Sequence, residues 1–191
     1  MKSINWYFSA LCCERLLPNY LAFQQAFTWG RGDVQILRQG LDYVWQYLET
    51  GEFDAEKITQ LHDQCVEIIP NSETSDIYKN PDIYITIAQN ACFGICGILD
   101  VLIRFDPERN GNILSHTVDT VILYTDNSDI KDEQKSNNYI FHHPLMQREL
   151  KIEDESLTLL EKTPEITPDF LVKFKKLWDN DGKSNLDLSA D

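Results

Sequence analysis

The segment Cys13-Glu14-Arg15 brings together a thiol, a carboxylate and a guanidinium, which are residue types that can support nucleophilic catalysis. A catalytic thiol needs a neighbouring base or cation that lowers its pKa. Arg15 stays protonated and cannot act as a base, and no histidine lies near it in the sequence. We therefore predict a structural role for this segment and no catalytic residue in the chain. An enzyme that uses the thiol of Cys13 is the competing hypothesis.

The structural interpretation requires partners for the two charged side chains. Glu14 and Arg15 could each bind a loop or pair with Asp42 or another charge of the next helix, with the rings of Tyr20 and Trp45 buried against that junction. Perturbed charged clusters are often structural rather than catalytic. The predicted structural residues are Cys13, Glu14, Arg15, Pro18, Asn19, Tyr20, Asp42 and Trp45.

Cys92 and Cys96 are four residues apart and share one helix face, so they could supply two metal ligands, with His116 as a third. That face is apolar, however, and free cysteines commonly pack as small hydrophobic residues. His142 and His143 precede Pro144, which is the pattern of a helix start. We predict no metal site and no cofactor.

Acidic residues are concentrated in the segment 126–169, with aromatic residues between them. Such a run usually forms a solvated surface. Carboxylates beside aromatic anchors can also imitate phosphates and bind the lysines and arginines of a nucleic-acid-binding protein. The predicted partner-binding residues are Asp126, Asp129, Asp132, Glu133, Tyr139, Phe141, Glu149, Glu153, Asp154 and Glu155.

The elements that must position these residues are helices, because apolar residues recur at helical spacing and no segment has a convincing strand pattern. Pro18 is expected to break or kink the first helix, and residues 127–140 are expected to form a loop. Asp33 and Asp54 are predicted N-caps, and Gly51 a predicted helix end. A capping residue precedes proline at three further predicted starts, which are Asn80-Pro81, His143-Pro144 and Thr167-Pro168.

Residues 81–105 are apolar nearly all round, which indicates a buried helix. The sequence therefore predicts an all-α, single-domain bundle of about seven or eight helices around this central helix. The domain is expected to span 1–182, and 183–191 to form a flexible tail.

The chain is acidic, with 17 Lys and Arg against 31 Asp and Glu and a net charge of −14. This charge argues against nucleic acid or an anionic membrane as a direct partner, since both require clustered cations. The five cysteines lie in apolar helical patterns, and the first residues lack a signal-peptide pattern. Both features favour a reduced, cytoplasmic protein.

The string Cys13-Glu14-Arg15-Leu16-Leu17-Pro18-Asn19-Tyr20, with Phe23, Gly32-Asp33, Leu41-Asp42 and Trp45 after it, resembles the YjaG-like family of small bacterial proteins of unknown function. Ser75–Tyr78, His116 with Val118, and the segment 143–149 extend the resemblance. It implies an all-α fold of this length and suggests that some relatives act as immunity proteins beside toxin genes. The acidic connection at 125–140 and the tail depart from the family pattern.

The function that these observations predict is non-enzymatic binding of a basic protein. In its most specific form, the chain is an immunity protein that neutralises a cationic nuclease toxin, because opposite charges steer association. The alternative is a housekeeping scaffold that forms homo-oligomers and whose acidity only favours solubility.

Overall fold

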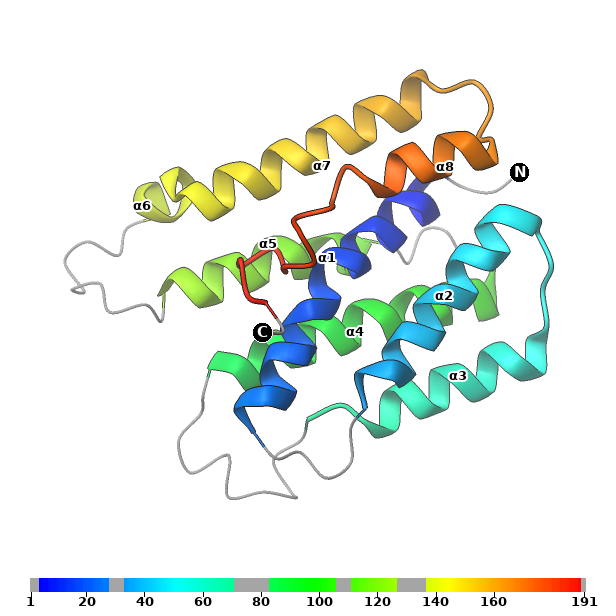
Figure 1. Ribbon diagram of the computed structural model, residues 1–191, viewed down its shortest axis with the longest axis horizontal. Coiled ribbons are helices and arrows are strands. Elements are labelled where there is room, and N and C mark those ends of the chain that lie inside the picture. The colour runs from blue at the N-terminus through cyan, green and yellow to red at the C-terminus, as the bar shows by residue number, and fades with distance from the viewer. Residues whose placement is uncertain (1–3, 28–32, 71–82, 106–110, 127–136, 190–191) are drawn as a thin grey trace.

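The structure is a computed structural model that describes residues 4–27, 33–70, 83–105, 111–126 and 137–189. These residues form eight helices and contain no strand, which confirms the predicted all-α fold (Figure 1). The helices are α1 (Ile4–Ala26), α2 (Val34–Thr50), α3 (Ala55–Glu67), α4 (Ile83–Arg104), α5 (Gly111–Asp126), α6 (Asn137–His142), α7 (Pro144–Lys162) and α8 (Pro168–Lys175).

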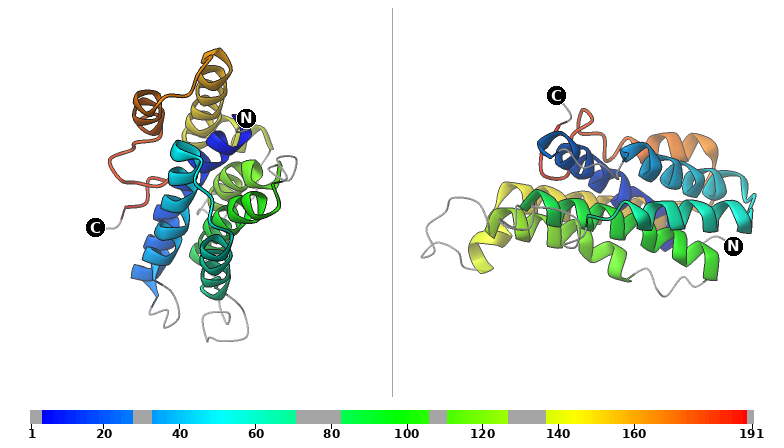
Figure 2. Two further views of the ribbon diagram at one scale, coloured as in Figure 1. Left: turned by 90° about the vertical axis from the view of Figure 1, so that its right-hand side faces the viewer. Right: turned by 90° about the horizontal axis from the view of Figure 1, so that it is seen from below.

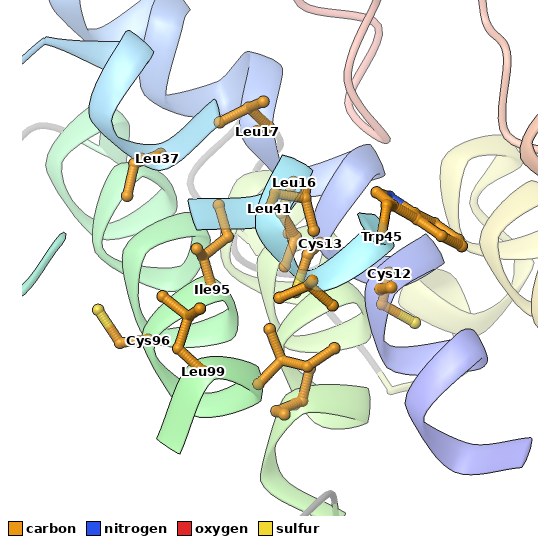
Figure 3. Close-up of a cluster of buried hydrophobic side chains, with 14 of the residues drawn as sticks. Cys12, Cys13, Leu16, Leu17, Leu37, Leu41, Trp45, Ile95, Cys96 and Leu99 are labelled. Atoms are coloured by element: carbon orange, nitrogen blue, oxygen red, sulfur yellow. The ribbon is translucent and has the colours of Figure 1, made fainter. Parts of the chain in front are cut away.

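Helix α4 is the central helix of the bundle, as predicted, and contacts α1, α2, α3 and α5. Its glycines allow close packing: a Cβ atom added at Gly94 would lie 3.3 Å from Leu16 of α1, and one at Gly97 would lie 3.1 Å from Ile113 of α5. Figure 3 shows side chains of α1, α2 and α4 meeting in this core. Helix α7 lies on the opposite side of the molecule from α3 (Figures 1 and 2).

Helix α4 is also long and apolar enough to cross a membrane, by length and composition alone. In the structure, 72% of its most apolar window is buried against the rest of the chain. The core position explains the composition, because a helix surrounded by other helices has to be apolar on most sides.

The predicted caps form the expected contacts. The carboxylate of Asp33 accepts a hydrogen bond from Gln35 N, and that of Asp54 accepts from Glu56 N and Lys57 N. Gly51 ends α2 in the left-handed conformation at φ 79°. His143 and Thr167 cap α7 and α8, each followed by proline. The predicted start at Asn80-Pro81 lies outside the described residues.

Of the break or kink predicted at Pro18, the break is wrong, because α1 continues through this residue to Ala26. A proline inside a helix costs about 3 kcal/mol. Leu16, Tyr20 and Phe23 on the two sides of Pro18 are fully buried in the main core, and this burial offsets the cost. The loop predicted at 127–140 is likewise wrong over its last residues, where α6 begins at Asn137.

The C-terminal segment, residues 180–188, is packed on the bundle instead of forming the flexible tail predicted from residue 183. Ser184, Asn185 and Leu186 are buried. The backbone N–H of Asn185 donates to the carbonyl of Arg15, and its side chain donates to the carbonyl of Thr117. Sequence periodicity missed this segment because polar side chains and backbone, rather than a helical apolar stripe, hold it in place.

Candidate functional site

Glu14 is a buried carboxylate of α1 that faces α2. It accepts hydrogen bonds from both terminal nitrogens of Arg38, at 2.6 and 2.8 Å, and from the indole N–H of Trp45 at 2.7 Å. Arg38 also pairs with Asp42 at 2.8 Å. Bidentate contacts of this kind are strong and directional, so they fix α2 against α1.

Arg15, the next residue, faces α7. Its Nε atom donates to Oε1 of Glu149 at 3.1 Å, and both side chains are almost completely buried. Glu153 lies 3.7 Å from the same guanidinium and accepts a hydrogen bond from the hydroxyl of Thr117 at 2.7 Å. Burial raises the pKa of Glu153, since the Thr117 hydrogen bond and Arg15 only partly compensate for lost solvation.

The two cysteine thiols beside this network are fully buried. Burial raises the pKa of Cys12 to about 12, although Arg15 opposes the shift. Burial also raises the pKa of Cys13 well above its usual value. Because the thiolate is the nucleophile, neither sulfur is activated, and this geometry opposes the hypothesis of a catalytic thiol.

Asn19 and Tyr20, two further residues of the predicted structural set, anchor two distant segments to α1. The amide nitrogen of Asn19 donates to the side-chain oxygen of Asn185 at 3.0 Å. The hydroxyl of Tyr20 donates to the carbonyl of Ile68 at 3.1 Å. The ring of Trp45 is covered on one face by the ammonium of Lys175, 4.4 Å from the ring centroid.

The predicted partner-binding residues do not form a single surface. Glu149 is buried in the ion pair with Arg15 and Glu153 is mostly buried, so both are wrong as surface contacts. In the sequence, Glu149 and Glu153 resemble part of a solvated acidic run, but in the structure both side chains point toward the interior of the bundle. Asp126, Phe141, Asp154 and Glu155 are exposed, and Tyr139 is half-buried. Asp129, Asp132 and Glu133 lie outside the described residues.

Arg38, Thr117 and Asn185 complete the network and are not among the residues predicted from the sequence. The pairing of Arg38 with Asp42 could have been predicted, because Arg38 precedes Asp42 by four residues and so shares its helix face. Nothing in the sequence indicates the role of Asn185, since that role depends on the position of the C-terminal segment against α1 and α5 in the folded chain.

The metal ligands considered for the sequence do not converge. Cys92 and Cys96 are buried in the core, and the ring of His116 packs on Phe93 with centroids 6.1 Å apart. Burial raises the pKa of Cys92, and a hydrogen bond with Cys65 is the largest cause of the raised pKa of Cys96. Over the part of the chain that the structure describes, no three His, Cys, Asp or Glu side chains are grouped as a metal ion requires.

The fold and the site together define a class of all-α protein in which adjacent acidic and basic residues of the first helix are held by two different helices, α2 and α7. Comparison with known proteins agrees with the fold. The chain belongs to the family described as "Protein of unknown function (DUF416)", whose model matches residues 2–189. The resemblance to YjaG-like proteins is thereby confirmed.

Similar proteins are known in several bacteria. The chain is 25% identical to the uncharacterized protein YjaG of Escherichia coli strain K12 over 181 residues, which cover 95% of this chain and 88% of that protein. It is 24% identical to YjaG of Salmonella typhimurium strain LT2 over 186 residues, with the same coverage. The crystal structure of a DUF416 family protein from Shewanella baltica OS155 shares the fold, with a TM-score of 0.81, 24% identity, and coverage of 98% of this chain and 94% of that chain.

Proposed function

We propose that this protein is a non-enzymatic, acidic binding protein of the cytoplasm whose partner is a basic protein. In its most specific form, the proposal is an immunity protein that neutralises a cationic nuclease. The observation that carries the proposal is the solvent-facing side of α7, which combines exposed carboxylates with exposed apolar side chains.

This surface, the α7 outer face, consists of Leu150, Asp154 and Glu161, with Phe141 of α6 at one end. The spacings of four and seven residues place the three α7 side chains on the same side of the helix. Asp154 and Glu161 are exposed, and Leu150 and Phe141 are 36% and 52% exposed. Apolar anchors beside charged groups are typical of protein interfaces.

The buried side of α7 supports the same proposal because it holds the helix rigid. The Arg15–Glu149 pair and the hydrogen bond from Thr117 to Glu153 attach α7 to α1 and α5. A rigid surface loses little conformational entropy on binding, so more of the contact energy contributes to affinity. The net charge of −14 would also accelerate encounter with a basic partner.

The test is binding of the purified protein to the basic product of a neighbouring gene, measured over a salt series. We expect a complex whose association rate falls as salt rises. The double variant Asp154→Asn/Glu161→Gln should slow association several-fold. The double variant Glu52→Gln/Glu67→Gln removes the same charge from exposed positions on other elements and serves as the matched control.

Equal effects of the two double variants would show that only net charge matters for association and would contradict a specific role of the α7 outer face in binding. A basic toxin encoded beside the gene that forms no measurable complex would contradict the proposal as a whole. The alternative of a homo-oligomeric scaffold predicts a dimer or larger assembly in light scattering, whereas a binding protein awaiting its partner is expected to be a monomer.

A further inference from the structure

A pocket of about 570 Å³ lies where the start of α1, the end of α2 and the α7–α8 connection meet. Its apolar walls come from Ile4, Tyr7, Leu48, Pro164 and Ile166. This volume and largely apolar lining are within the range of pockets that bind small molecules, about 300–1,000 Å³. Phe141, at one end of the α7 outer face, does not line the pocket, whereas Glu161 of that face precedes the lining residue Thr163 by two positions.

Thr163 and two carboxylates complete the lining, with Glu49 from α2 and Glu165 from the α7–α8 connection. Both residues are exposed. Among the described residues that line the pocket, none is basic, so neither carboxylate is neutralised from within the lining. A pocket with apolar walls and acidic groups complements a ligand that has an apolar body and a positive charge.

Two hydrogen bonds fix residues of the pocket lining. The hydroxyl of Tyr7 donates to the carbonyl of Leu48 at 3.0 Å, which joins α1 to α2 at the pocket floor. The hydroxyl of Thr163 donates to the carbonyl of Leu159 and closes the end of α7. A preformed pocket does not have to be created by the ligand, which favours binding.

We infer that this pocket binds an amphipathic organic cation, an ammonium group carried on an apolar body. The apolar body occupies the space between Ile4, Leu48 and Ile166, and the ammonium lies beside Glu49 and Glu165. A free amine and a lysine side chain of a protein present the same charged group. The inference does not depend on the proposed basic protein partner, because the probes below are small molecules.

The experiment compares 4-phenylbutylamine, 4-phenylbutanol and 4-phenylbutyrate, which share an apolar body and differ in charge. Binding is measured by calorimetry and by NMR shifts of the methyl groups of Ile4, Leu48 and Ile166. We expect the amine to bind roughly fivefold more tightly than the alcohol, since two partly solvated ion pairs contribute about that much, and the butyrate to bind most weakly. Nα-acetyl-lysine amide presents its ammonium as a lysine of a protein does, and its binding tests whether the ligand can be a protein side chain.

The double variant Glu49→Gln/Glu165→Gln should abolish the preference for the amine over the alcohol. Glu67→Gln/Glu155→Gln, with the same change in net charge at exposed positions away from the pocket, should retain it. Methyl shifts at the pocket with loss of preference only in the first variant would support the inference. Equal binding of amine and alcohol, the same loss in both variants, or no binding of any of the probes would overturn it. None of these outcomes depends on whether a protein partner binds the α7 outer face.

Discussion

Arg15 and Glu149 are 134 positions apart in the sequence and form an ion pair in which both side chains are almost completely buried. The residue before Arg15, Glu14, is held by Arg38 and Trp45 on α2. Two adjacent residues of α1 therefore connect two different helices, α2 and α7, because successive helical side chains differ in direction by about 100°.

The two carboxylates near Arg15 should respond differently to neutralisation. Glu149→Gln leaves the Arg15 guanidinium buried without a full counter-charge, and we expect it to lower the free energy of unfolding by about 3 kcal/mol. Glu153→Gln keeps an acceptor for Thr117 and removes repulsion from Glu149, so its effect should stay within about 1 kcal/mol. Urea unfolding of both variants measures the difference, and equal losses would contradict the assignment of Glu149 as the main partner.

The raised pKa of Glu153 also sets a pH dependence. The folded protein binds this proton more tightly than the unfolded chain, so the associated stability is complete below the unfolded pKa near 4.5 and is lost as pH rises through the folded pKa. The stability of Glu153→Gln relative to the unmodified protein should therefore increase from pH 4 to 7. A constant difference over this range would be inconsistent with a raised pKa.

The contacts around Glu14 show what the sequence could and could not predict. The amphipathic patterns and the capping residues predicted the helices, since these depend on residues close in the chain. The proximity of Glu14 to Trp45 was also anticipated, because α1 and α2 follow each other. The pairing of Arg15 with Glu149 was not, because sequence periodicity gives no register between helices separated by more than a hundred residues.

The C-terminal segment should contribute measurably to stability. Asn185→Ala removes the partner of the Asn19 amide and the hydrogen bond to Thr117, so we expect a loss of about 1–3 kcal/mol. Lys183→Ala, at an exposed position in the same segment, is the control and should change stability by less than about 0.5 kcal/mol. Indistinguishable denaturation curves for the two variants would restore the interpretation of this segment as a tail.

The thiols of Cys12 and Cys13 should resist alkylation in the native protein. Both are buried with raised pKa values, so reaction requires an opening of the core. We expect labelling at pH 8 at least about a thousandfold slower than in urea, since core opening costs several kcal/mol. Mass spectrometry identifies the labelled site, and rapid labelling of Cys13 would revive the hypothesis of a catalytic thiol.

His116 should make stability depend on pH in the opposite direction from Glu153. Burial lowers the pKa of His116 below its usual 6.5, although Asp119 opposes the shift. The stability contributed by the neutral ring is present above pH 6.5 and is lost as pH falls through the unfolded pKa toward the folded one. His116→Gln should flatten the stability profile between pH 7 and 5.5, and an unchanged slope would show that another group titrates there.

The return of the C-terminal segment to α1 has a consequence for biosynthesis. Helix α1 is synthesised before α7, so Arg15 can acquire Glu149 only after α7 has been made, and Asn19 can acquire Asn185 later still. Domains generally fold as units during synthesis, so a chain that stops before Glu149 lacks the counter-charge of Arg15 on α1. The native surroundings of Arg15 and Asn19 on α1 therefore form only after α7 and the C-terminal segment have been synthesised.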